Sequence, residues 1–137
     1  MTYDGNHEEI SFKYESQFFS CKKNRMFQLL SKVWESKELH HVDVSVFLLI
    51  AATCNYSTQQ CKYNIPMLAK IAKMDKSNFY KSIERLSETD IITVRQQFGK
   101  DMEIYLNFNY ASEGTKVKQD IFDFFGADDD IVATNYP

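Results

Sequence analysis

The stretch that most constrains this chain runs from Asn64 to Ile92 and reads NIPMLAKIAKMDKSNFYKSIERLSETDII. Its apolar residues recur at three- and four-residue steps, which is the spacing of one face of an α-helix. The pattern predicts two short helices, at about residues 65–73 and 76–88, separated by a tight break. The expected buried residues are Leu68, Ala69, Ile71 and Ala72 on the first helix and Phe79, Ile83 and Leu86 on the second.

Side chains near the start of each helix support these boundaries. Asn64 and Asp75 can each cap a helix, because their side-chain oxygens accept hydrogen bonds from otherwise unpaired backbone N–H groups. Pro66 falls in the first turn, where its missing donor is not needed. Two helices joined by so short a break indicate a helix-turn-helix, a motif whose second helix enters the major groove of DNA.

The same stretch resembles the winged helix-turn-helix class. The matching positions are Leu68-Ala69, Met74-Asp75, Lys76–Tyr80, Ile83, Leu86 and Ile91-Ile92. In that class a leucine-alanine step precedes a short turn, a capped recognition helix and the entry into a β-hairpin called the wing. Lys73 and Asp90 stand where many members carry glycine, and Asp tolerates the left-handed backbone conformation better than Lys does.

The distribution of charge suits a polyanionic ligand, although the net charge of the whole chain is −3. Residues 62–100 carry eight Lys/Arg against four Asp/Glu, a net charge of +4, whereas residues 101–137 carry two against eight, a net charge of −6. The basic block coincides with the helix-turn-helix and the predicted wing. Because the local field steers a charged ligand, this block is the expected side for nucleic acid.

Other classes of function find little support in the sequence. The longest apolar run, Val46–Ala52, is far too short to span a membrane, and the N-terminus lacks a signal-peptide pattern, so we expect a soluble, cytoplasmic protein. Three cysteines without CxxC spacing indicate reduced thiols. Without a Gly-rich phosphate loop, a GxSxG motif or zinc-finger spacing, we expect neither an enzyme nor a cofactor. The adjacent His40 and His41 lack a third metal ligand and are expected in a solvated loop.

The segments around the helix-turn-helix complete a predicted α+β fold, a winged helix-turn-helix with extensions at both ends. An amphipathic helix is expected at about 22–37, and a largely buried one at 44–55, capped by Asp43. Two strands at 91–98 and 102–110, joined at Gly99–Asp101, would form the wing. A short strand is expected at 61–63, and the resemblance to winged helices implies that it pairs with the wing. The apolar stripe predicted for the first helix comprises Met26, Leu29, Leu30, Val33 and Trp34. In the last strand Ile104, Leu106 and Phe108 alternate with Glu103, Tyr105 and Asn107, which predicts one apolar and one polar face.

We divide the chain into an N-terminal arm at 1–21, a winged helix domain at 22–110, and a linker with an acidic tail at 111–137. The arm contains the aromatic segment Ile10–Phe19, which we expect to pack on its own domain; contact with a second copy is the alternative. The tail contains DIFDFFGADDD at 120–130. Its favoured interpretation is a short terminal helix followed by a frayed acidic end. The alternative is a peptide that recruits a partner, such as a replication protein, or covers the basic surface.

The polar residues of the second helix are the candidate DNA contacts, because Phe79, Ile83 and Leu86 should face the core. The residues that this leaves outward or at the edge are Lys76, Ser77, Asn78, Tyr80, Lys81 and Arg85. Asn78 can pair with adenine and Lys76 with guanine or phosphate, while the other four suit phosphate oxygens. The wing would add Arg95, Gln97 and Lys100 along the backbone or in a minor groove. The alternative is a winged helix that contacts only proteins, with these positions solvated.

A wider segment, from Arg25-Met26-Phe27 to the YLNFNY at 105–110, loosely resembles small plasmid replication proteins of Gram-positive bacteria. Phe108 stands where that group carries Pro after the asparagine of its final strand. The resemblance implies sequence-specific binding of duplex DNA in replication initiation or maintenance of a plasmid or phage. A winged helix transcriptional repressor is the alternative. In either role we expect a homodimer.

Overall fold

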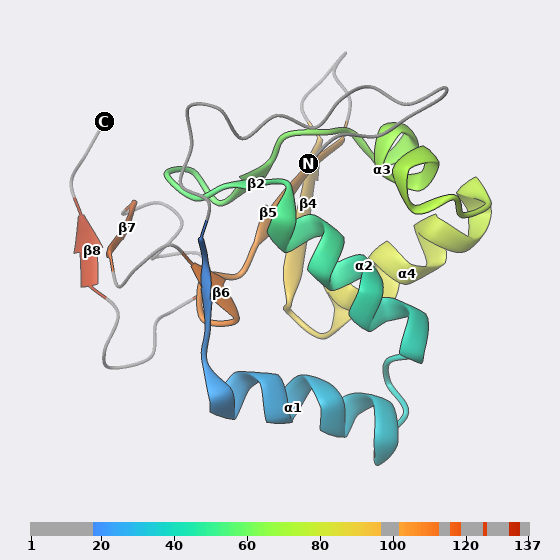
Figure 1. Cartoon of the computed structure of the whole chain (residues 1–137), viewed down its shortest axis with the longest axis horizontal. Helices are drawn as coiled ribbons and strands as arrows, with labels where there is room; N and C mark the ends of the chain where they lie inside the picture. Colours follow the sequence, from blue (N-terminus) through green and yellow to red (C-terminus); the bar gives the residue numbers. More distant parts are fainter. Residues whose placement is uncertain (1–17, 97–101, 113–115, 119–124, 126–131, 135–137) are drawn as a thin grey trace.

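In the computed structural model, the described residues are 18–96, 102–112, 116–118, 125 and 132–134. Among them lie four helices and a small antiparallel sheet (Figure 1). The helices are α1 (Lys23–Trp34), α2 (His41–Ala52), α3 (Ile65–Ala72) and α4 (Lys76–Glu88). The sheet has the strand order β2-β3-β5-β4, formed by β2 (Cys54–Asn55), β3 (Gln60–Cys61), β5 (Met102–Leu106) and β4 (Ile92–Gln96).

The order of these elements is that of a winged helix-turn-helix domain. Two helices precede a short strand, the helix-turn-helix α3–α4 follows, and the hairpin β4–β5 closes the domain. A short strand does pair with the wing, but it lies at Gln60–Cys61 and not at 61–63, and Gln60 is the residue that pairs with Tyr105 of β5. The fold class expected from the sequence is therefore confirmed.

The hydrophobic core lies where α2, α3 and α4 meet the sheet. Its largest fully buried side chains include Phe47, Ile50, Ile65, Leu68, Phe79, Leu86, Ile91, Ile92 and Ile104. The predicted inner face of α4 is confirmed, because Phe79, Ile83 and Leu86 are all buried. The stripe predicted for α1 is wrong at Trp34, which is 58% exposed, because this helix buries only Leu29 and Val33.

The start of α2 differs from the prediction. The helix begins at His41, so the two histidines do not form a loop: His40 is the N-cap and His41 the first helical residue. Asp43 therefore lies inside the first turn, where its Oδ2 accepts a hydrogen bond from the His40 N–H at 2.7 Å. The helix ends at Ala52, and Cys54 belongs to β2.

The last predicted strand also ends early. The strand β5 ends at Leu106. The next residue, Asn107, uses its side chain to bond two backbone groups that do not belong to the β-sheet hydrogen-bond ladder. Its Nδ2 donates to the Asp90 carbonyl at 2.8 Å, and its Oδ1 accepts from the Asn109 N–H at 3.0 Å. Asn107 was expected on the polar face of this strand, and the structure shows that it is buried. It fixes the connection between α4 and the wing.

Both ends of the described chain form strands. The strand β1 (Ser20–Cys21) pairs antiparallel with β6 (Ala111–Ser112), and both residues of β6 are buried, so the linker predicted from residue 111 is wrong there. The strands β7 (Lys116–Lys118) and β8 (Val132–Thr134) pair in parallel, where a polar linker and a frayed end were expected.

The aromatic residues near both termini pack on the domain. Phe19 stacks on Tyr56 with ring centroids 5.7 Å apart, in keeping with the interpretation that the arm packs on its own chain. Phe125 meets Phe108 edge to face at 6.0 Å. The rest of the predicted arm segment, residues 10–17, and the acidic stretch at 126–131 lie outside the described residues.

Burial governs the chemistry of two thiols. Cys54 and Cys61 face each other across β2 and β3 and are both buried. Burial raises the pKa of both thiols, which keeps them protonated and unreactive. In the described part of the chain, no helix has the length and apolarity needed to cross a bilayer.

The turn between α3 and α4 uses the left-handed backbone conformation, at a position where the sequence resemblance places glycine in many winged helix proteins. Lys73 has φ 54° and ψ 39°. The N–H groups of Lys73 and Met74 both donate to the Ala69 carbonyl, and these bonds end α3. Asp90, after α4, has φ 61°. Both departures from glycine therefore fall at positions where a side chain costs about 1 kcal/mol or more.

We expect Lys73→Gly to raise the free energy of unfolding by about 1 kcal/mol, because glycine adopts this backbone conformation without a Cβ clash. Lys70→Gly is the matched control. Lys70 is an exposed residue inside α3, where glycine should instead cost about 1 kcal/mol. Urea denaturation of the two variants measures both effects, and destabilisation by Lys73→Gly would contradict the account of this turn.

Candidate nucleic-acid interface

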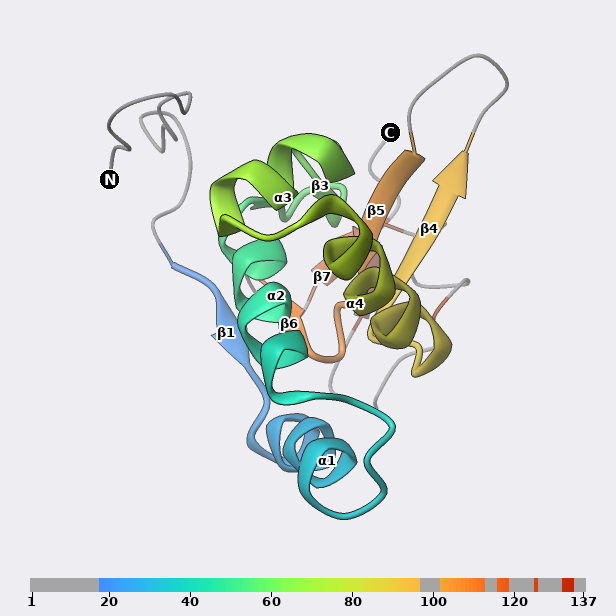
Figure 2. The same ribbon diagram turned by 90° about the vertical axis from the view of Figure 1, so that its right-hand side faces the viewer.

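The helix α4 lies beside α3 and the first wing strand, β4 (Figure 2). Its apolar residues face the core, so its opposite side is turned to solvent. Five of the predicted contact residues lie on that side and are exposed in the chain: Lys76, Ser77, Asn78, Tyr80 and Lys81. The structure thus brings these residues together on the first half of α4.

The start of α4 is organised by a short local contact. Asp75 is the N-cap residue, but its carboxylate accepts from the Ser77 hydroxyl at 2.8 Å and not from a backbone N–H of the described helix. Asp75 therefore occupies the predicted N-cap position, but its carboxylate bonds the Ser77 side chain and not the helix backbone. The cap at Asn64 is confirmed, since its Oδ1 accepts from the Met67 N–H at 2.9 Å.

A buried ion pair joins α4 to the central helix α2. The Arg85 guanidinium approaches the Asp43 carboxylate with both of its edge nitrogens, Nε to Oδ2 at 2.7 Å and Nη2 to Oδ1 at 2.9 Å. The Ser82 hydroxyl donates to Oδ1, and the His40 N–H donates to Oδ2. All acceptor sites of a fully buried carboxylate are thereby engaged, as a buried charge requires.

This network perturbs the pKa of both partners. Burial by itself would raise the pKa of Asp43, but the hydrogen bonds from Arg85, His40 and Ser82 outweigh it and hold the pKa below its usual range. The same hydrogen bond to Asp43 raises the pKa of Arg85. Both groups are therefore charged at neutral pH, and the pair fixes the rotation of α4 about its own axis.

Arg85 was expected outward or at the edge of the helix face and available to phosphate, whereas its guanidinium is engaged by Asp43. Its side chain is 20% exposed and turned toward Asp43. Sequence reasoning also missed Asp43 and Ser82 as the residues that hold α4 in place. The available signal was a polar residue on each of two apolar faces, Asp43 on α2 and Ser82 beside Ile83 on α4.

The wing presents a mixed polar face. The Arg95 guanidinium lies 4.9 Å from the centre of the Tyr105 ring, so it is held against the sheet. On the same face the Gln60 Nε2 donates to the Glu103 carboxylate at 2.6 Å. One acidic group thus lies beside the wing arginine. Gln97 and Lys100, the other two predicted wing contacts, lie outside the described residues.

A small pocket separates the start of α4 from the wing strands. It has a volume of about 230 Å³ and is lined by Asn64, Ile65, Pro66, Lys76, Tyr80, Gln96 and Met102. It lies between the starts of α3 and α4 on one side and the ends of β4 and β5 at Gln96 and Met102 on the other, and the exposed Lys76 and Tyr80 of α4 line it.

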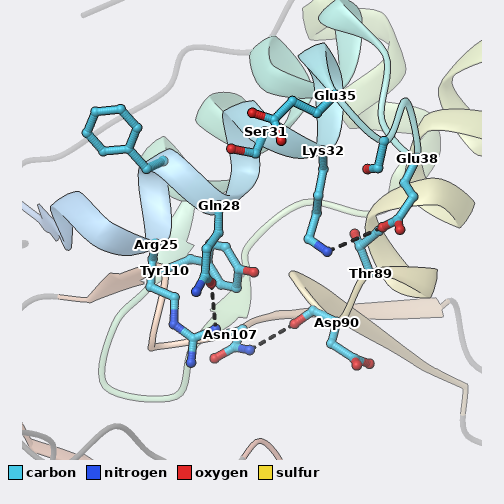
Figure 3. Close-up of a pocket in the computed structure, with 12 residues that line it drawn as sticks. Arg25, Gln28, Ser31, Lys32, Glu35, Glu38, Thr89, Asp90, Asn107 and Tyr110 are labelled. Carbon is cyan, nitrogen blue, oxygen red and sulfur yellow. Dashed lines mark hydrogen bonds and ion pairs between the residues drawn. The ribbon is translucent and has the colours of Figure 1, made fainter.

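A larger pocket, of about 680 Å³, lies between α1 and the end of α4 (Figure 3). Its polar side chains already engage one another. Lys32 pairs with Glu38 at 3.3 Å, Arg25 donates to Gln28 at 3.2 Å, and Asn107 holds the Asp90 carbonyl. The pocket is lined by residues of α1 and by Thr89, Asp90, Asn107 and Tyr110, and none of the exposed residues at the start of α4 lines it. Among the described residues, no three His, Cys, Asp or Glu side chains are grouped to hold a metal ion.

Comparisons with known proteins give little beyond the architecture. No protein-family model matches the chain, and no curated protein shows significant sequence similarity to it. Among solved structures, the crystal structure of the transcriptional regulator SlyA is similar with a TM-score of 0.38 and 19% identity, over 61% of this chain and 56% of that one. The fold assignment rests on the order and pairing of the elements themselves.

Proposed function

We propose that the chain binds duplex DNA in a sequence-specific manner through α4 and the wing. The observation that supports this most is the exposed set Lys76, Ser77, Asn78, Tyr80 and Lys81 on the first half of a helix whose other side is fixed to the core. Asn78 is the proposed base reader, because an amide can bond both donor and acceptor of adenine. The other four position the helix on guanine edges or phosphates, and Arg95, Gln97 and Lys100 of the wing extend that contact.

We propose two alternative biological roles. Replication initiation or maintenance of a plasmid or phage follows from the sequence resemblance alone, whereas the structural comparison names a transcriptional regulator. We propose a homodimer for either role, with its recognition helices roughly 34–36 Å apart, about one turn of DNA. Footprinting on the encoding replicon separates the two: direct repeats in an origin indicate an initiator, and an inverted repeat over a promoter indicates a repressor.

A titration of duplex DNA at increasing salt tests the proposal. Each phosphate contact contributes a slope of about −0.9 to the plot of log affinity against log salt concentration. We expect Lys81→Ala to weaken binding to all sequences alike and to reduce the magnitude of the slope by about one.

The matched control for that titration is Lys37→Asn. Lys37 is an exposed lysine after α1 with φ 58°, a conformation that Asn tolerates, so this variant removes one positive charge without straining the chain. Its slope should equal that of the parent. Affinity that is weak and independent of salt would contradict DNA binding and favour a winged helix that contacts only proteins.

A further inference from the structure

The outer face of α3 carries two lysines, Lys70 and Lys73. Pro66 and Lys70 are four residues apart and share one side of the helix, and Lys73 follows three positions later at the C-cap. All three residues are exposed, whereas the residues that α3 buries lie on its other side. The sequence from residue 62 to residue 74 contains three lysines and no Asp or Glu. This face is therefore positively charged, and its own segment of the chain supplies no acidic residue to offset that charge.

The lysine face adjoins the proposed DNA contacts. Pro66 lines the same small pocket as Lys76 and Tyr80 of α4, so the start of α3 borders the start of α4. At the other end of α3, Lys73 precedes Lys76 by three positions, a span of at most about 11 Å. A helix-turn-helix that inserts its second helix into the major groove carries its first helix across the DNA backbone. DNA bound at α4 therefore brings phosphates to the lysine face.

The backbone conformation of Lys73 is a second, independent observation. Its φ of 54° and ψ of 39° lie in the left-handed region, which favours Gly or Asn over a residue with a longer side chain. A positive charge near the end of a helix is favourable, but Lys70 already supplies one in the last turn of α3. Among the described residues, neither lysine takes part in an ion pair. Lysine is thus an unfavourable choice at this position for the free chain, and such local strain is typical of functional sites.

We propose that Lys73 and Lys70 bind phosphates of the DNA strand that passes α3, so that the interface extends from α4 and the wing onto the outer face of α3. This inference rests on the proposed DNA binding. Lysine suits the role, because its ammonium group is a compact charge on a flexible stem and contacts phosphate without reading bases. Lys73 is the principal contact, since it lies next to α4 and its backbone conformation is the less favourable of the two.

Lys73→Asn removes the charge without disturbing the turn, because asparagine tolerates the left-handed conformation. We expect affinity for all duplexes to fall roughly ten-fold near 0.1 M salt, and the magnitude of the salt slope to decrease by about one. Lys37→Asn is the matched control. Lys37 is also an exposed lysine in the left-handed region, with φ 58°, and it follows α1, which Figures 1 and 2 show at the opposite end of the molecule from α3. This control should leave the affinity and the slope unchanged.

Lys73→Gly separates a lysine that serves binding from one that serves the fold. It should resist urea better than the parent, because glycine fits the turn, and yet bind DNA as weakly as Lys73→Asn does. A glycine variant that is more stable and binds DNA with the parental affinity and slope would overturn the inference. Adding Lys70→Gln to Lys73→Asn should lower the slope by about one more. An unchanged slope in that double variant would overturn the part of the inference that concerns Lys70.

Single methylphosphonate substitutions in the duplex locate the contact, because each replaces one charged phosphate with a neutral group. The parent should lose affinity wherever it contacts the substituted phosphate. Lys73→Asn should become insensitive at one or two of those phosphates and keep the parental sensitivity at the others. Parental sensitivity at every phosphate would show that Lys73 touches none of them. A parent that does not bind duplex DNA overturns the proposed function and this inference together, whereas a parent that binds no better than Lys73→Asn overturns this inference alone.

Discussion

Replacing Arg85 with alanine should lower the free energy of unfolding by about 3–5 kcal/mol, because it leaves a buried carboxylate without its counter-ion. Asp43 is fully buried, and Arg85 supplies two of its four hydrogen bonds. Urea denaturation at pH 7 measures the loss. Arg95→Ala is the matched control, because Arg95 lies on the wing sheet and its removal leaves no buried charge unpaired.

The pH dependence of stability follows from the same pair. The hydrogen bonds from Arg85, His40 and Ser82 hold the folded-state pKa of Asp43 below the value of an unfolded aspartate, which is about 3.9, so the stability it contributes is fully present above about pH 4. That contribution is lost as the pH falls through the folded pKa. In the Arg85→Ala variant burial dominates and the pKa of Asp43 should rise, which moves the loss to higher pH. A parental stability curve that is unchanged between pH 5 and pH 3 would contradict this role for Asp43.

A double-mutant cycle separates the ion pair from simple packing. Asp43→Leu combined with Arg85→Met should cost less than the sum of the two single changes, because no charge is then left buried alone. Additive effects would show that the two side chains act independently. The result also bears on DNA binding, since the pair fixes which side of α4 is turned outward.

Replacing Asn78 with alanine should relax the base preference at one position of the DNA site and reduce discrimination there by about 1–3 kcal/mol. Asn78 is exposed in the first turn of α4, beside Lys76 and Ser77, where its amide can meet a base edge. A selection from randomised duplexes, followed by affinities for single-base variants of the preferred site, measures the change.

Glu84→Gln is the matched control for Asn78→Ala. Glu84 is an exposed acidic residue on the same helix, so neutralising it should raise affinity for all sequences alike without changing base preference. If Asn78→Ala weakens binding equally to every sequence, Asn78 does not read bases. The proposed base contact would then be wrong even if DNA binding itself is right.

The sequence alone determined the helix-turn-helix and the order of the elements around it. The spacing of Phe79, Ile83 and Leu86 is local information, and so is the polar cap at Asn64, because both depend on residues within a few turns of the same helix. The wing was also predictable, since the alternation along β5 and the turn residues Gly99–Asp101 each appear within one short segment of the sequence.

Only the tertiary structure decided which polar residues stay on the surface. Asp43 and Arg85 are 42 positions apart and each looks like an ordinary helix residue, so neither shows alone that the two meet. The same holds for Asn107, whose partner Asp90 lies in another turn. Trp34 shows the converse, since its place in an apolar stripe predicted burial, yet α2 covers only the neighbouring side of α1. Periodicity tells which residues share a face, whereas the packing of distant segments decides what that face meets.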